Sequence, residues 1–130
     1  MNADIRLDIE RRFLAALFLY PRAVDVESRH FEVATHGLIY EAISEAYEAF
    51  PWPHYANDGY DDIALAIVIE IIRKRGRELD ETLGRFPETA NQFAAWAERY
   101  IVDELMTESV TAAALDDLVN QIRECPRCGK

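Results

Sequence analysis

Apolar and polar residues follow the spacing of an α-helix along most of this 130-residue chain. In the stretch 9–20 the apolar positions recur every three or four residues. The apolar face of the predicted helix broadens along this stretch, so that few residues in its second half are polar. A helix this apolar cannot lie on a surface, so other elements must pack around it. Pro21 lacks a backbone N–H and ends the helix. The pattern therefore predicts a central core helix before Pro21.

The middle of the chain predicts two more helices. Thr35 is a candidate N-cap for an amphipathic helix that ends at Pro51. The stretch 63–72 is apolar except for one glutamate, and its length favours a buried helix over a strand. Three basic residues follow, and Gly76 suits the position just past a helix C-terminus. We therefore expect this helix to end at Gly76 and an irregular stretch to follow it.

The last third of the chain predicts a long helix and a shorter one. Pro87 suits a first helical position, and an apolar stripe continues from there to Leu105. Thr107 or Ser109 can begin a last amphipathic helix, which reaches Glu124. The sequence leaves open whether these two helices fuse or fold back as a hairpin. It predicts an all-α protein, a compact multi-helix bundle with a C-terminal helix or helical hairpin.

The same spacing divides the chain into three parts. A helical bundle is expected over 1–106, an amphipathic helix or hairpin element over 107–124, and a cysteine-containing tail over 125–130. A length of 130 residues suits one domain with a substantial core.

The charge and composition of the chain limit which binding partners and which cellular compartment we expect. The formal net charge is −10, which argues against direct binding of nucleic acid because phosphate contacts need clustered lysines and arginines. A basic protein partner is compatible with this charge. The charged N-terminal residues do not resemble a signal peptide, and no apolar run is long enough to cross a membrane. We expect a soluble cytoplasmic protein.

The tail over 125–130 contains the residues that are best suited to bind a metal ion. Cys125 and Cys128 form a Cys-x-x-Cys motif with the proline and glycine of a zinc knuckle. Tetrahedral zinc needs four ligands, so two more would come from a second chain, from His30, His36 or His54, or from the rest of a longer zinc ribbon inside which this sequence stops. The alternatives are an inert tail or, with less support, a redox pair, which would need a helix N-terminus to lower a thiol pKa.

Other residue patterns do not indicate catalysis. The histidines are isolated, and adjacent acidic pairs point apart on a helix, so no acid/base pair or Ser/His/Asp arrangement emerges. The loop 51–60 is unusual for its aromatic residues, including Trp52 and Tyr55. These either cap the end of the bundle or form an exposed docking site, since aromatic side chains anchor interfaces.

The order of several short segments resembles the N-terminal domain of DnaB-type replicative helicases. Ile9-Glu10 with Leu14-Ala15-Ala16-Leu17 is similar to that domain's opening Glu-x-x-x-Leu-Gly-Ala-Leu helix, with Ala15 in place of glycine. Phe31 and the stretch 36–43 resemble its Phe…His-x-x-Ile-Phe-x-Ala-Ile segment. Weaker similarities follow at 62–65 and 75–80 and in the closing helix at 90–102. The resemblance covers about residues 9–104.

This resemblance implies a protein-interaction and assembly module of DNA replication. The family's domain is a helical bundle with a helical hairpin that pairs with copies of itself and helps to recruit primase and loader proteins. The Gly-x-x-x-x-Gly-Lys-Ser/Thr motif of the ATPase motor is absent from the sequence, so we expect a non-enzymatic module. Its expected partners are a replicative helicase, a primase, a loader or further copies of itself in a homo-oligomer. The alternative is a nucleic-acid adaptor built on a zinc knuckle.

The apolar stripe of the last helix is the self-pairing surface that the resemblance favours. It either pairs with another copy or packs on its own bundle, and the sequence does not decide between them. The stripe consists of Leu115, Leu118, Val119 and Ile122.

Overall fold

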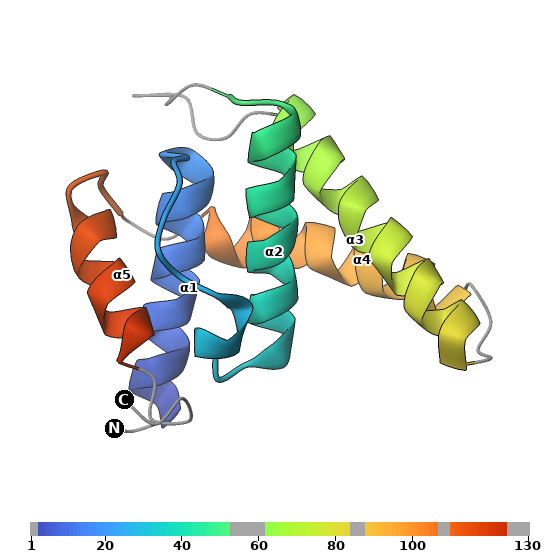
Figure 1. The fold of residues 1–130 in the computed structure, drawn as a ribbon, viewed down its shortest axis with the longest axis horizontal. Helices are drawn as coiled ribbons and strands as arrows, with labels where there is room; N and C mark the ends of the chain where they lie inside the picture. The colour runs from blue at the N-terminus through green and yellow to red at the C-terminus, as the bar shows by residue number, and fades with distance from the viewer. Residues whose placement is uncertain (1–2, 53–61, 84–87, 107–109, 125–130) are drawn as a thin grey trace.

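The computed structural model describes residues 3–52, 62–83, 88–106 and 110–124, and the regular structure in these ranges is entirely helical. A 3₁₀ turn at Ser28–His30 precedes the second helix, and the fourth continues into a π-helical turn at Ile101–Leu105 (Figure 1). The predicted all-α bundle is confirmed. Its helices are α1 (Ala3–Leu19), α2 (Ala34–Ala49), α3 (Asp62–Leu83), α4 (Glu88–Tyr100) and α5 (Ala114–Arg123).

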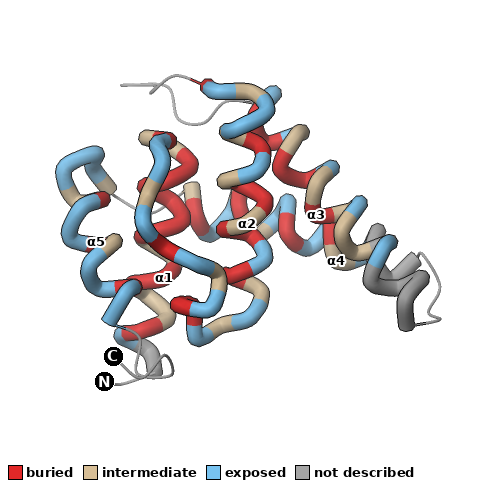
Figure 2. The backbone as a smooth tube through the Cα atoms, viewed as in Figure 1, coloured by how far each residue is buried: buried red, intermediate tan, exposed pale blue. Residues whose placement is uncertain are grey.

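Helix α1 lies between α2 and α5 and also contacts the π-helical turn (Figure 1). Residues 13–18 are all buried, so every side of this part of the helix is covered (Figure 2). The last helix-type hydrogen bond runs from the amide of Tyr20 to the carbonyl of Ala16 at 2.8 Å, just before Pro21. The prediction of a central core helix that ends before this proline is confirmed.

The start of α2 differs from the prediction. The N-cap position is Val33, which has no side-chain capping bond, so Thr35 is not the cap. The carboxylate of Glu10, on α1, accepts hydrogen bonds from the amides of Glu32 and Val33 instead. A residue 23 positions away in sequence therefore replaces the local cap, which a search for nearby capping side chains cannot detect.

Helix α3 continues past Gly76 to Leu83, so the predictions of a helix end and of an irregular stretch after it are wrong. A glycine inside a helix costs about 1 kcal/mol relative to alanine. Packing along α4 and α2 outweighs this cost. The Arg75 side chain of α3 donates hydrogen bonds to Glu41 and Glu45 on α2.

Helices α4 and α5 do not form one continuous helix. After the π-helical turn the chain returns to α1, and α5 packs along it (Figure 1). The candidate start residues Thr107 and Ser109 lie outside the described residues, while Thr111 Oγ1 accepts a hydrogen bond from the amide of Ala114 at 3.2 Å. Buried residues of α5 belong to the same core cluster as those of α1, so α5 is part of the bundle.

A helix that crosses a bilayer must be both long and apolar. No helix in the described ranges meets both conditions.

Candidate interaction site

Two charged residues of α1 lie inside the bundle, one helical turn apart. The side chains of Arg6 and Glu10 are 2% and 0% exposed, and Arg6 Nε donates to Glu10 Oε2 at 3.0 Å. Burying two charges costs several kcal/mol for each ion unless their remaining hydrogen-bonding groups are also satisfied. The partners of these two side chains therefore determine what the pair does for the fold.

Glu10 joins α1 to the start of α2. Besides Arg6, its carboxylate accepts hydrogen bonds from the amides of Glu32 and Val33 at 2.7 and 3.3 Å and from His36 Nδ1 at 2.8 Å. Burial by itself would raise the pKa of Glu10, but the hydrogen bonds from His36 and the two amides outweigh it and lower the pKa below the ordinary value of 4.5. The carboxylate is therefore ionised at neutral pH.

Arg6 joins α1 to the end of α5. Its Nη2 donates to the carbonyl of His30 at 2.6 Å and to that of Ile122 at 3.0 Å, and its Nη1 donates to the carbonyl of Gln121 at 2.9 Å. The last carbonyls of a helix have no partner within it and carry partial negative charge. The guanidinium satisfies two of them and fixes α5 against α1 and the 3₁₀ turn.

His36 extends this network from Glu10 to α4. A carboxylate can only accept, so Nδ1 carries a proton. Nε2 lies 2.7 Å from the hydroxyl of Tyr100 and accepts a hydrogen bond from it when the ring is neutral. A hydroxyl, an imidazole and a carboxylate in this order also occur in hydrolase triads. Here, however, the carboxylate also accepts hydrogen bonds from Arg6 and two backbone amides, so it is not reserved for the imidazole. The arrangement favours a structural role.

Tyr100 begins a row of stacked aromatic rings that reaches the surface along α4. Its ring lies 5.7 Å from that of His36 on one side and 5.0 Å from that of Trp96 on the other. The Trp96 ring in turn stacks on Phe93 at 5.7 Å. Spacings of three and four residues place the three side chains on one helix face. We call Phe93, Trp96 and Tyr100 the aromatic row; Trp96 is 37% exposed within it.

The predicted self-pairing stripe is not a free surface. Leu115, Leu118 and Ile122 are at most 2% exposed, and Val119 packs against the same core. Of the two alternatives left open by the sequence, the structure has the stripe packing on its own bundle. A single copy packs α5 against α1, which buries Leu115, Leu118 and Ile122 and leaves Val119 partly buried.

Trp52, the other predicted docking residue inside the described ranges, is also buried. It is 3% exposed, and its Nε1 donates to the carbonyl of Phe18 at 2.9 Å. Its ring packs edge-on against Tyr47 at 5.4 Å. Trp52 therefore caps the end of the bundle, which was the alternative to a docking role. Tyr55 lies outside the described residues.

The candidate zinc ligands Cys125 and Cys128 lie outside the described residues, as does His54. Both ring nitrogens of His36 are already hydrogen-bonded. His30 Nδ1 accepts a hydrogen bond from the amide of Glu27 at 2.9 Å, so in the neutral ring the proton lies on Nε2. Neither histidine presents a free lone pair to a metal, and the described ranges contain no cluster of metal-binding side chains.

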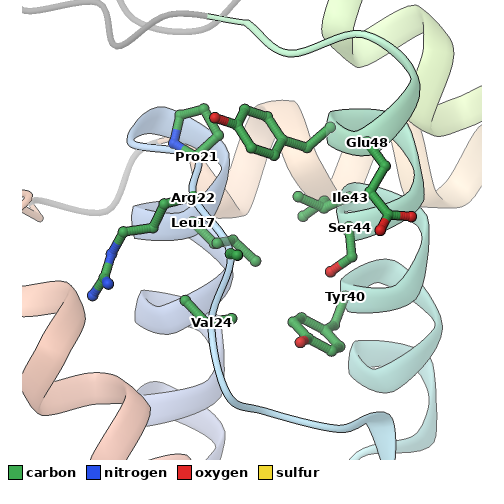
Figure 3. A pocket seen from close by; sticks show the side chains of 10 residues that line it. Leu17, Pro21, Arg22, Val24, Tyr40, Ile43, Ser44 and Glu48 are labelled. Atoms are coloured by element: carbon green, nitrogen blue, oxygen red, sulfur yellow. The ribbon is translucent and has the colours of Figure 1, made fainter.

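One small groove lies between α2 and the segment that follows α1 (Figure 3). Its volume is about 220 Å³, below the 300–1,000 Å³ typical of ligand pockets. The Tyr40 hydroxyl donates to the carbonyl of Val26, and burial raises the pKa of this phenol. Arg22 points away from the groove and pairs with Asp116 on α5. These features do not indicate a binding site for a small molecule.

The sequence predictions missed the central residues of this site. Arg6, Glu10, Phe13 and Leu17 recur at helical spacing, so the two charged residues extend the apolar stripe of α1, which is a sign of burial. The spacing of the aromatic row was visible as well, but it could equally belong to a core.

Comparison of the chain with protein-family models, with curated proteins and with solved structures finds no match.

Proposed function

We propose that this chain is a non-enzymatic protein-interaction module that assembles with components of DNA replication: a replicative helicase, a primase, a loader or further copies of itself. The observation that carries the proposal is the distribution of polar and aromatic groups. The buried titratable side chains bond to one another and hold the helices together, whereas a preformed aromatic row lies at the surface.

The residues that carry the resemblance to the helicase N-terminal domain support this proposal. Glu10 and His36 belong to two separate matching segments, and they are hydrogen-bonded to each other at 2.8 Å. Phe31, from the second segment, packs on Phe13 of α1 with ring centres 5.8 Å apart. The matching positions therefore include core contacts between α1, α2 and the turn before α2, which is what a shared helical scaffold requires.

The aromatic row gives this scaffold a surface for a partner. Interface cores are enriched in tryptophan and tyrosine, and a few such anchors supply most of the binding free energy. Trp96 is held by a ring on each side, so docking against it costs little side-chain entropy.

The test is the solution mass of the full chain by light scattering, alone and mixed with a purified replicative helicase or primase. We expect a stable complex with one of these proteins, or a dimer or larger species of the chain alone. Each sample is repeated with a metal chelator, because a complex that separates on chelation would favour the zinc-knuckle alternative instead. A chain that remains monomeric in every mixture would refute the proposal.

A further inference from the structure

We propose, as an extension of the proposed interaction function, that the aromatic row on α4 docks a positively charged segment of a protein partner that presents aliphatic side chains flanked by lysine or arginine. The row consists of Phe93, Trp96 and Tyr100, and its inner end is fixed by the hydrogen bond between Tyr100 and His36.

The geometry of the rings favours protein side chains over nucleobases. The Trp96 ring lies nearly parallel to both neighbours, at 16° to Phe93 and 12° to Tyr100, so each of these offset stacks occupies part of its aromatic surface. A base that stacks on a protein needs an open aromatic face, and the rings of Phe93 and Tyr100 already occupy part of that surface on Trp96. Aliphatic side chains pack well against ring edges, and this contact does not require the rings to separate.

The exposed charges on the row's own helix and on the turn that follows it favour a basic partner. The exposed charged side chains of the stretch 92–106 are three acids and one base: Glu98, Asp103, Glu104 and Arg99. The whole chain carries −10, so a second copy would bring like charges together at this face. Phosphate groups would be repelled in the same way. Lysine or arginine beside the apolar contact would complement this surface and speed the encounter.

The hydrogen-bond network makes the row a rigid anchor. Tyr100 is fixed by His36, His36 by Glu10, and Glu10 by Arg6 and two backbone amides. The rings are therefore ordered before a partner arrives, which removes part of the entropic cost of binding.

The probes are two synthetic helical peptides with the same leucine face, one with lysine and arginine on its polar face and one with glutamate at those positions. Binding to the full chain is measured by calorimetry at low and physiological salt. We expect the basic peptide to bind and the acidic one not to bind. Trp96→Ala is expected to weaken binding at least tenfold, as for an interface anchor. Leu38→Ala is the matched control, since Leu38 is 41% exposed on α2, outside the row.

A second pair of variants tests the charge independently of the ring. Asp103→Asn with Glu104→Gln is expected to weaken binding of the basic peptide several-fold and to reduce its salt dependence. Glu48→Gln, at an exposed position of α2, is expected to change neither. Circular dichroism of each variant confirms that it folds. Equal binding of the acidic peptide, or equal loss of binding in Leu38→Ala and Trp96→Ala, would overturn the inference.

The outcome separates this inference from the proposed function. If the chain binds a helicase or primase, or self-associates, and Trp96→Ala leaves that association unchanged, the docking face is elsewhere and the proposed function stands. If the chain associates with no replication protein, with no second copy and with neither peptide, both fail. Binding of a single-stranded oligonucleotide that Trp96→Ala abolishes would also overturn the choice of a protein partner.

Discussion

Replacing Glu10 by glutamine tests whether the buried network holds the fold together. The carboxylate accepts four hydrogen bonds, from Arg6, His36 and the amides of Glu32 and Val33. The carbonyl oxygen of a glutamine has two lone pairs, and its NH₂ group would face donors. At least two donors would therefore lose their acceptor, and the Arg6 guanidinium would lose its counter-charge.

The expected cost follows from these losses. A buried donor left without an acceptor costs about 1–3 kcal/mol, and breaking a buried ion pair by removing one partner costs about 3–5 kcal/mol. We expect Glu10→Gln to lower the free energy of unfolding by about 4 kcal/mol. With a urea dependence of about 2 kcal/mol per molar, the midpoint of unfolding falls by about 2 M.

The assay is urea unfolding followed by circular dichroism at pH 7, with Glu48→Gln as the matched control. Glu48 is exposed, so the same chemical change there is expected to stay within about 0.5 kcal/mol. A cost below about 1 kcal/mol for Glu10→Gln would refute the reasoning, because it would mean that the four donors find water or other acceptors readily.

Three further predictions concern single contacts. Tyr100→Phe removes the hydroxyl that is hydrogen-bonded to His36 Nε2, and we expect the free energy of unfolding in urea to fall by about 1 kcal/mol; a cost near zero would count against a stabilising role for this bond. Leu118 is 2% exposed, so Leu118→Ala leaves a cavity and should lower the free energy of unfolding by about 2–5 kcal/mol, measured by thermal unfolding. The solution mass should stay unchanged; a changed mass would indicate that α5 pairs with another copy. Burial, followed by the charge of Arg29, lowers the pKa of His30 below the ordinary value of 6.5. Because the unfolded chain then takes up this proton first, stability should fall as pH drops below about 6.5 towards the folded pKa. The urea midpoint should therefore decrease less on acidification in His30→Asn than in the original protein. The asparagine oxygen can still accept the hydrogen bond from the amide of Glu27. The same pH profile in both proteins would contradict this prediction.

The helical pattern was enough to predict the class of fold and its central element. Apolar spacing over 9–20 predicts a wrapped helix, and α1 is buried on all sides over 13–18. It was also enough to predict that a proline ends α1. These features depend on residues close in sequence, whose spacing directly records which side of a helix is covered.

The features that could not be predicted depend on distant partners. The carboxylate that replaces a cap at α2 comes from α1, and the packing that carries α3 through Gly76 comes from α2 and α4. The α5 stripe has the same sequence pattern whether it packs on its own bundle or on another copy. Local propensity cannot separate those cases, because the deciding contacts are far apart in the chain.

The contact between Arg6 and Ile122 also constrains the order of events during synthesis. The two residues are 116 positions apart, and at about 5–20 residues per second a ribosome needs about 6–23 s to travel from one to the other. During that interval the guanidinium has none of its α5 acceptors, so a nascent α1 cannot reach its final packing. The N-terminal helix is thus made first but completed last, when the chain that encloses it has emerged.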